Sequence, residues 1–339
     1  MIKFFIFCLF PLLTTLLICR VFITHFGNRL IDKPNDRSSH TIPTPRGGGI
    51  ALATSSILTI FVAWQLGYLS SAPLLWLMLP AGLITILGIA DDLFNLNIGT
   101  RLFVQTLLAA IGIFLIGIDR DLPVIMQGLL AALMVLFLVW MSNLYNFMDG
   151  INGLAALEAI SACLCMGLIY WLQDKQSDSL HLMAIIAASS FGFLYWNFPK
   201  AKLFMGDAGS LFLGLSIGLI TLENMGKDNN LLAAWLIMLG VFITDATYTL
   251  LYRMITKQPF HQAHRSHTYQ KAAIRFKSHS ITTFGVVLIN IIWLFPLAFL
   301  TANGKLHLMA ALLISYTPLF ILAKKYRAGE MEHYVDKVL

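Results

Sequence analysis

The chain is built from apolar segments separated by short polar connections, and this pattern limits the folds open to it. A helix needs about 20 mostly apolar residues to cross the hydrocarbon core of a bilayer. Only 12% of the residues are charged and 58% are hydrophobic, whereas soluble domains carry roughly 25% charged residues. The sequence therefore predicts an all-α, polytopic membrane helix bundle with about 11 transmembrane helices. The segments that we expect to cross are 4–24, 48–66, 73–90, 100–118, 124–142, 153–172, 180–197, 209–222, 231–252, 281–300 and 306–323.

The basic residues predict how these segments are oriented. Cytoplasmic connections of membrane proteins are enriched in Lys and Arg. With a periplasmic N-terminus, only five of the 23 basic residues fall on the external side, namely Lys3, Arg120, Lys175, Lys227 and Lys305. We therefore expect a periplasmic N-terminus and a cytoplasmic C-terminus. A single transmembrane domain is expected over residues 1–323, followed by a charged cytoplasmic tail over 324–339.

Charge, cysteines and the first segment indicate no other class of protein. The net charge of +6 is dispersed over loops that flank apolar segments, so no nucleic-acid partner is expected. The four cysteines lie in apolar segments without zinc-ligand spacing, which is typical of small core residues. The first segment begins like a secretory signal peptide, but it has no small-residue cleavage site, so we expect a retained helix.

The expected cytoplasmic connections carry most of the unusual polar residues. Asp91 and Asp92 directly follow an apolar segment. Adjacent carboxylates near lipid are costly unless a cation neutralises them or one of them serves as a base. Magnesium prefers carboxylate oxygens and is often shared with substrate phosphates. A solvated helix end is the alternative interpretation of this pair.

Two further connections carry carboxylates and amides. Asn143, Asn146 and Asp149 are spaced i, i+3 and i+6 and lie along one helix face. Their groups suit a ribose, a base edge or a metal-bound water, and a polar capping loop is the alternative. Asp207 precedes an apolar segment, which suits either a helix cap or a phosphate-binding helix terminus.

The remaining two connections are cationic. His264, Arg265 and His267 share one loop, and imidazole and guanidinium groups suit a diphosphate or a proton transfer. Zinc and a merely solvated loop are the alternatives, and the lack of an accompanying cysteine disfavours zinc. The connection at 26–49 presents anion-binding side chains, which are Arg37, His40 and Arg46.

Taken as a set, these loops resemble a known family. Between residues 33 and 271 the chain is similar to the polyprenyl-phosphate N-acetylhexosamine-1-phosphate transferases of glycosyltransferase family 4, which are related to the phospho-N-acetylmuramoyl-pentapeptide transferase. The form of the Arg37–His40 and His264–His267 blocks is most similar to the branch that initiates O-antigen. The blocks that carry the resemblance are 37–40, 43–49, 88–92, 143–153, 206–214 and 264–267.

The resemblance implies an enzyme of the bacterial inner membrane. The expected reaction converts a UDP-N-acetylhexosamine and undecaprenyl phosphate to an undecaprenyl-diphosphate-sugar and UMP, with Mg²⁺ as cofactor and Mn²⁺ as the alternative ion. A 6-deoxy sugar donor and a role in lipopolysaccharide synthesis are expected, with UDP-N-acetylglucosamine as the alternative donor. A homodimer is the expected assembly, if the chain is not a monomer.

Residue roles follow from the same resemblance. Metal ligation is expected from Asp207 and Asp92, and catalysis from Asp91, Asp92, His264 and His267. Substrate binding is expected from Arg37, His40, Arg46, Asn143, Asn146, Asp149 and Arg265. Many members carry a second Asp where this chain has Asn152, and an amide cannot replace a carboxylate as an anionic ligand or a base.

Other readings remain open at this point. A transporter or flippase would also have many helices, but it predicts repeated halves with broken helices near the midplane, and no internal repeat is evident. A degenerate homologue without activity is the second alternative. Two acids within apolar segments, Glu158 and Asp245, could help to position the active-site loops. Asp245 could instead pair with Arg253.

Overall fold

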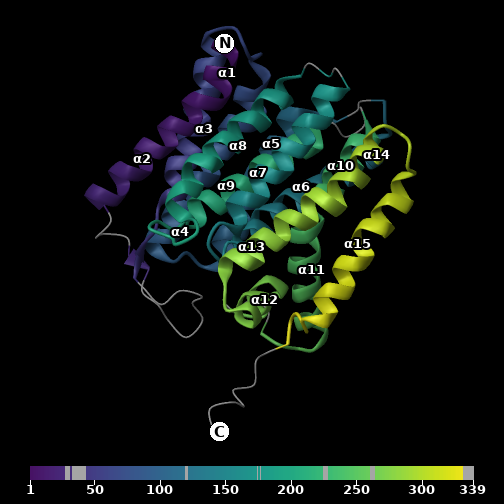
Figure 1. Ribbon diagram of the computed structural model, residues 1–339. Helices are drawn as coiled ribbons and strands as arrows, with labels where there is room; N and C mark the ends of the chain where they lie inside the picture. Colours follow the sequence, from purple (N-terminus) through teal and green to yellow (C-terminus); the bar gives the residue numbers. More distant parts are fainter. Residues whose placement is uncertain are drawn as a thin grey trace.

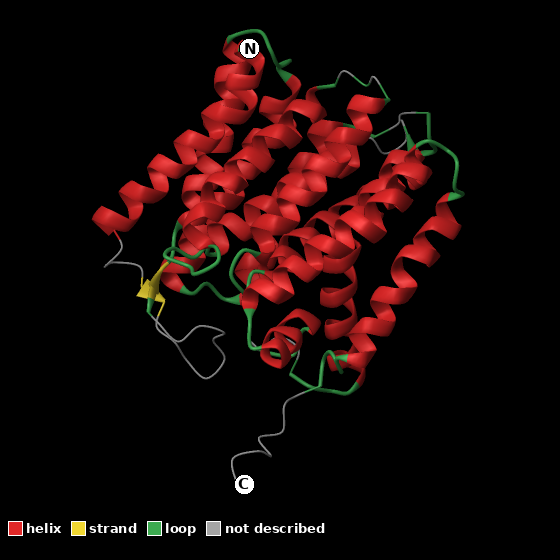
Figure 2. Ribbon diagram, viewed as in Figure 1, coloured by secondary structure: helices red, strands yellow, loops and turns green. Residues whose placement is uncertain are grey.

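The computed structural model describes residues 1–26, 31–32, 43–118, 121–173, 175, 177–223, 228–259 and 264–330, and the described part is almost entirely helical. Figure 1 shows a bundle of long helices side by side, and Figure 2 shows one small pair of strands at one end. The predicted apolar segments are helical, with 231–252 divided between α10 and α11, so the prediction of a helical membrane bundle is confirmed.

The helices of the first half are α1 (Ile2–Phe4), α2 (Phe10–Phe26), α3 (Gly48–Gln65), α4 (Leu79–Phe94), α5 (Ile98–Ile116), α6 (Val124–Met148) and α7 (Leu154–Leu172). Those of the second half are α8 (Asp178–Asn197), α9 (Asp207–Glu223), α10 (Asn229–Met238), α11 (Gly240–Ile255), α12 (Thr268–Phe276), α13 (His279–Leu288), α14 (Phe295–Ala302) and α15 (Leu308–Lys325). Three π-helical segments continue neighbouring helices, which are η1 (Phe5–Leu9), η2 (Leu74–Met78) and η3 (Ile289–Leu294). The strands β1 (Ile31–Asp32) and β2 (Thr44–Pro45) pair antiparallel.

The number of spans is lower than predicted when length and apolar composition are applied to the described residues. Nine helices meet both requirements, or ten if α10 and α11 count as one span bent by 68°. The predicted count of eleven is therefore not confirmed. The difference is α9, which has only 17 residues. It is nevertheless the most enclosed helix, because every residue from Ala208 to Leu222 is buried.

Small residues allow α9 to pack closely inside the bundle. A Cβ atom at Gly214 would lie 2.4 Å from the carbonyl oxygen of Met141, and one at Gly218 would lie 2.8 Å from Leu138. Both neighbours belong to α6. Lipid tails are as apolar as the helices, so the hydrophobic effect does little to drive helices together in a membrane. Helices associate there through such close contacts instead. The outer helices α6 and α15 bury only 17% and 22% of their apolar windows inside the protein, as expected of surfaces that face lipid.

The polar connections converge on one end of the bundle, which we call the site end: the end at which α4 finishes and α9 begins. Figures 1 and 2 show α12, the strand pair and several loops there, while α1 lies at the opposite end. The last helix, α15, finishes at the site end (Figure 1). The arrangement therefore brings loops far apart in sequence onto one face.

Candidate active site

Close backbone approach sets the position of the acidic residues. Gly88 lies one turn before the pair Asp91–Asp92 on α4, and a Cβ atom there would be 2.5 Å from Cα of Ala208. Gly49, at the start of α3, likewise packs against Gly209, where a Cβ atom would lie 2.2 Å from the backbone nitrogen. Glycine at these two positions lets the N-terminus of α3 and the C-terminal part of α4 contact the start of α9. The carboxylates of α4 and α9 are thereby brought together.

Backbone hydrogen bonds fix the same region from the side of β2. The amide of Gly48 donates to the carbonyl of Phe204 at 2.9 Å, and the amide of Gly49 donates to the carbonyl of Met205 at 2.8 Å. In return, the amide of Phe204 donates to the carbonyl of Pro45 at 2.8 Å. The backbone of the segment that precedes Asp207 is therefore hydrogen-bonded to β2 and the start of α3. These bonds fix the position of Asp207, the first residue of α9.

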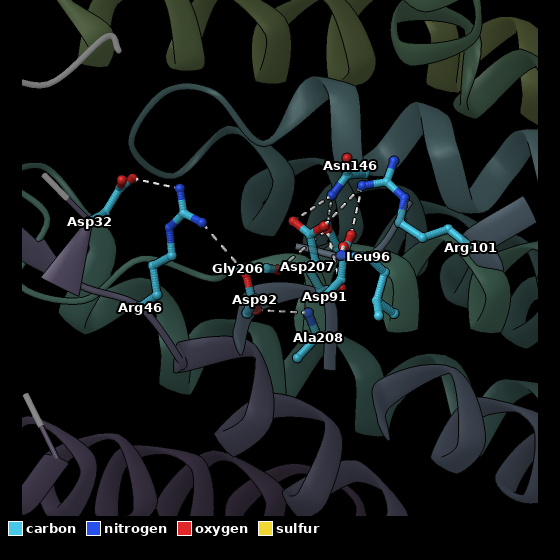
Figure 3. A network of polar contacts seen from close by, with 11 residues as sticks. Asp32, Arg46, Asp91, Asp92, Leu96, Arg101, Asn146, Gly206, Asp207 and Ala208 are labelled. Atoms are coloured by element: carbon cyan, nitrogen blue, oxygen red, sulfur yellow. Dashed lines mark hydrogen bonds and ion pairs between the residues drawn. The ribbon is translucent and has the colours of Figure 1, made fainter. Parts of the chain in front are cut away.

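Asp91 is buried and fully engaged by neighbouring donors. Its carboxylate accepts a hydrogen bond from the backbone amide of Leu96 at 2.9 Å and from Nη1 of Arg101 at 2.6 Å (Figure 3). The same Arg101 nitrogen lies 3.8 Å from Asp207 Oδ2. Arg101 thus bridges the ends of α4 and α9, and Asp91 orients this guanidinium group.

Asp92 faces a different cation. Its Oδ2 accepts a 3.4 Å hydrogen bond from the amide of Ala208, and its Oδ1 lies 3.7 Å from Nη1 of Arg46. Arg46 also forms a 2.9 Å ion pair with Asp32 (Figure 3). Within the described residues, the buried Asp92 Oδ1 has no hydrogen-bond donor. A side chain at Gly206 would come within 2.6 Å of Asp92, so only glycine leaves this space open.

The polar stripe of α6 is divided by the fold. Asn146 donates to Asp207 Oδ1 at 2.9 Å and to Ser210 Oγ at 3.1 Å, so it orients the carboxylate (Figure 3). Asn143 lies one turn deeper, and its amide nitrogen donates to Gln105 at 2.6 Å and to the carbonyl of Val139. The structure therefore brings Asn146 to the carboxylates and directs the Asn143 amide nitrogen toward α5.

Asp149 and Asp207 sit in unfavourable surroundings for negative charge. Burial and the nearby carboxylates raise the pKa of Asp207, which precedes the apolar part of α9, to about 7. Burial and the charges of Asp207 and Asp92 raise the pKa of Asp149 well above its usual range, while Arg46 opposes the shift. Crowded carboxylates of this kind favour a bound cation.

Replacing Asp149 by Asn is expected to stabilise the metal-free protein at neutral pH. Because the folded-state pKa is raised, the native state binds more protons than the unfolded state once the pH exceeds the ordinary Asp value, so Asp149 costs stability as pH rises. Thermal unfolding in chelator should show a gain for the variant that is largest at neutral pH and disappears near pH 3 to 4. A variant less stable than the native protein at every pH would contradict this assignment.

The histidine loop is anchored by an acid of α11. Asp245 accepts hydrogen bonds from the backbone amides of Thr268 at 2.8 Å and Tyr269 at 2.9 Å, and His267 Nδ1 lies 3.3 Å from its carboxylate. The carboxylate therefore caps α12 and orients His267. Arg253, the alternative partner, instead donates to Gln258 and to the carbonyl of Pro259. The structure thus favours the supporting role for Asp245.

The histidine rings stack at the end of α6. The ring of His267 lies 5.1 Å from that of His264 and 6.2 Å from that of Phe147. The hydroxyl of Tyr269 donates to the carbonyl of Phe147 at 2.9 Å. Phe147 follows Asn146 directly, so the histidine loop and the carboxylates share the end of α6.

The histidine loop combines a neutral imidazole with a guanidinium group. Burial and the neighbouring His267 lower the pKa of His264 to about 3, so its imidazole is neutral at physiological pH. Arg265 supplies the guanidinium group, and within the described residues its buried Nε has no hydrogen-bond partner. Arg37 and His40, predicted like Arg265 to bind substrate, lie outside the described residues.

Asn152 and Glu158 make structural contacts. The amide of Asn152 donates to the carbonyl of Pro199 at 3.0 Å, a contact that requires a donor and that a carboxylate could not make. Glu158 is buried in α7, where it accepts a 2.7 Å hydrogen bond from Asn290 of η3. Both residues therefore tie together helices behind the site.

The carboxylates fit a hard divalent cation. Among the described residues, no three His, Cys, Asp or Glu side chains form a preassembled metal site. Magnesium does not need one, because it usually keeps several waters and takes one or two carboxylates together with substrate phosphates. Asp207 and the donor-free oxygen of Asp92 provide that set. Zinc would instead favour His and Cys ligands.

Two important residues were not predicted to belong to the site. Arg101, in the first turn of α5, lies 3.8 Å from Asp207, and Ser210, in the first turn of α9, accepts a hydrogen bond from Asn146. The signal available for Arg101 was a cation that shortly follows Asp91 at the start of an apolar helix. Nothing in the linear spacing indicated which carboxylate it would meet.

Comparison with known proteins places this arrangement in a family. The model of glycosyl transferase family 4 matches residues 74–224, a range that contains Asp92, Asn146 and Asp207. A probable undecaprenyl-phosphate N-acetylglucosaminyl 1-phosphate transferase of Bacillus subtilis is 31% identical over 273 residues, which cover 78% of this chain and 75% of the relative.

Two further relatives agree. A decaprenyl-phosphate N-acetylglucosaminephosphotransferase of Mycolicibacterium smegmatis is 30% identical, over 68% of this chain and 64% of its own length. An undecaprenyl-phosphate alpha-N-acetylglucosaminyl 1-phosphate transferase of Thermotoga maritima is 26% identical, over 78% of this chain and 81% of its own length. The chain therefore belongs to glycosyl transferase family 4.

Proposed function

We propose that the protein transfers an N-acetylhexosamine-1-phosphate from a UDP-sugar to undecaprenyl phosphate and releases UMP. The observation that carries the proposal is the group of Asp91, Asp92 and Asp207 between the guanidinium groups of Arg46 and Arg101. Carboxylates for a metal beside fixed cations suit two phosphorylated substrates. The relatives named for polyprenyl-phosphate sugar-phosphate transfer support the same reaction.

Phosphoryl transfer depends more on positioning and charge stabilisation than on covalent chemistry. Mg²⁺ bound by Asp207 and Asp92 would neutralise charge on the donor diphosphate. Asn146 holds Asp207 in place, and Asp91 holds Arg101 beside it. Direct in-line attack by the lipid phosphate needs no covalent intermediate on the protein, and we favour it for that reason.

The cations have separate roles in this scheme. Arg46 and Arg101 stand on either side of the carboxylates and would stabilise the charge that develops on the transferred phosphoryl group. Arg265 and the histidine loop approach from the end of α6 and would bind the diphosphate of the donor. A neutral His264 can donate one hydrogen bond and accept another.

Orientation and location belong to the same proposal. The asymmetry of basic residues supports a cytoplasmic site end, where nucleotide sugars would be available. The N-terminus would then be periplasmic, with eleven crossings if the short α9 traverses the membrane. The bacterial inner membrane is the expected location.

The choice of donor separates two versions of the proposal. The named relatives use N-acetylglucosamine, so UDP-N-acetylglucosamine is the first donor to test. The form of the blocks 37–40 and 264–267 favours a UDP-linked 6-deoxy-N-acetylhexosamine and a role in O-antigen synthesis. Discrimination by one hydroxyl depends on whether a buried group must hydrogen-bond to it.

A donor panel tests the proposal. Purified protein is incubated with undecaprenyl phosphate, Mg²⁺ and one of several UDP-sugars, and released UMP is measured. We expect UMP only when an N-acetylhexosamine donor and the lipid phosphate are both present, with rates that differ at least tenfold between the preferred donor and UDP-glucose. Release of no UMP from any donor would reject the enzyme and leave the transporter reading.

A further inference from the structure

A cavity lies at the site end, between helices α11, α12, α13 and α15. The space between these helices is about 680 Å³, including the part open to the outside. The walls are mainly apolar, and the side chains that define it include Val241, Phe276, Val286, Leu319, Leu322 and Tyr326. No role in the proposed transfer reaction has been assigned to this cavity.

The cavity opens on the outside of the bundle, beside two apolar helices that we expect to face lipid. Two of its lining residues, Phe276 and Ile281, are 46% and 56% exposed. The spans that flank it, His279–Ala302 and Leu308–Lys325, bury only 28% and 22% of their apolar windows inside the protein. Along α15 the cavity extends from Tyr326 back to Leu319, a rise of about 10 Å at 1.5 Å per residue. It therefore reaches from the site end into the apolar layer.

Basic residues adjoin the lining of the cavity at the end where α15 finishes. Arg275 stacks over the ring of Tyr326 at 5.8 Å, and Lys277 follows the lining residue Phe276. Lys324 and Lys325 are exposed on the last turn of α15, next to Tyr326. The acid described nearby, Glu330, is paired with another cation, Arg327. Within the described residues, the cations that adjoin this lining therefore include Arg275, Lys277, Lys324 and Lys325, and the nearby acid Glu330 is paired.

The inner wall offers donors and also one carboxylate. Within the described residues, the buried hydroxyl groups of Thr244 and Thr268 have no hydrogen-bond partner, and both residues line the cavity. Asp245 also lines it, but its carboxylate is already bound by α12. A neutral ester carbonyl could accept from the hydroxyl groups, whereas a phosphate would be repelled from the Asp245 wall and kept near the cations that adjoin the lining.

We propose that this cavity binds one anionic glycerophospholipid of the surrounding bilayer. One acyl chain fills the apolar space, and the headgroup phosphate lies among Arg275, Lys277 and Lys324. The adjoining cations and the apolar depth together match this amphiphile. The bound lipid packs against α12, whose first residues hold His267 in place through Asp245.

The acceptor lipid is a poorer occupant because its phosphate must reach the carboxylates. Tyr269 forms part of the cavity wall, and its hydroxyl binds the carbonyl of Phe147 at the end of α6. Helix α12 therefore lies between this cavity and the carboxylates of Asp91, Asp92 and Asp207. A phosphate among the adjoining cations would remain on the wrong side of that helix.

Filling the cavity is the first test, and it does not depend on enzyme activity. A Cβ atom at Gly285 would meet nothing within 4 Å, and Gly285 lines the cavity, so Gly285→Phe fills the space without a backbone clash. Gly128→Phe is the matched control, because its Cβ position on the exposed face of α6 is equally open. The protein is exchanged into nanodiscs of phosphatidylglycerol or phosphatidylcholine, and retained lipid is counted by native mass spectrometry after extraction.

We expect the native protein and Gly128→Phe to retain one phosphatidylglycerol, with at least fivefold less phosphatidylcholine. Gly285→Phe should lose at least four fifths of the retained lipid. Equal retention by the two Phe variants, or no preference for the anionic lipid in the native protein, would overturn the proposal. Thermal unfolding of each variant confirms that the comparison is made on folded protein.

Charge removal is the second test and covers the case in which Gly285→Phe fails to fold. Each cation near an anionic headgroup is worth roughly a fivefold change in affinity, so Arg275→Gln with Lys277→Gln should weaken retention about 25-fold. Lys202→Gln is the control, since Lys202 also lies 5.8 Å from an aromatic ring, that of Trp196. An unchanged affinity in the double variant would overturn the proposal. Displacement of phosphatidylglycerol by an equal concentration of undecaprenyl phosphate would also overturn it and identify the acceptor as the occupant.

Discussion

Replacing Asp207 by Asn is expected to reduce UMP release by at least about 100-fold, the largest effect of any single substitution considered. The amide keeps the size of the side chain and an oxygen for the 2.9 Å hydrogen bond from Asn146. It removes the negative charge that would bind the cation beside Asp92. The protein should therefore fold and insert normally but respond weakly to added Mg²⁺.

The matched control is Asp228→Asn. Asp228 caps α10 by accepting from the amides of Asn230 and Leu231 at 3.1 Å, and it pairs with Lys175. The 17-residue α9 separates the two acids, about 25 Å at 1.5 Å per residue. Activity of this control should stay within about twofold of the native protein, since Asn is also a good helix cap. Near-native turnover of Asp207→Asn would contradict the metal assignment.

The second large effect is expected from Gly88→Ala. The added methyl group would lie 2.5 Å from the backbone of Ala208 and 2.6 Å from the carbonyl carbon of Asp207. Because both neighbours are backbone atoms, the start of α9 must shift, at a cost of about 1–3 kcal/mol in folding free energy. A displacement of about 1 Å at a reacting centre can lower the rate roughly 100-fold.

The control for this prediction lies on the same helix. A Cβ atom at Gly82 would meet only Ile57, at an ordinary 3.7 Å, so Gly82→Ala should be neutral or slightly stabilising. Thermal unfolding in detergent and UMP release together measure both variants. If Gly88→Ala behaved like Gly82→Ala, the close contact of α4 with α9 would not position the site.

The carboxylates that the sequence analysis grouped into one site lie near one another in the structure. Asp92 and Asp207 were assigned to one site although they are far apart in the chain, and the structure bridges their loops through the amide of Ala208. Their proximity could be expected from sequence because charged residues next to lipid are costly and tend to collect in a few places. The histidine loop was likewise expected nearby, and His267 does stack on Phe147 at the end of α6.

Partners across helices could not be predicted in the same way. Asn143 and Asn146 have the same type of side chain and a one-turn spacing, yet one donates to Gln105 and the other to Asp207. Arg101 was overlooked although it contacts Asp91 at 2.6 Å. Such pairings depend on how far each helix is rotated and how deep it lies. Neither quantity is encoded in local spacing.

The sequence by itself determined that this is a helical membrane protein with its polar residues gathered in a few connections. A stretch of about 20 mostly apolar residues is typical of a transmembrane helix and uncommon in soluble proteins. Only the tertiary structure decided which apolar faces meet protein and which meet lipid. The physical reason is that lipid tails are as apolar as Leu, so burial leaves little mark on composition. The enclosed α9, the bend between α10 and α11, and the cavity beside α15 all depend on that decision.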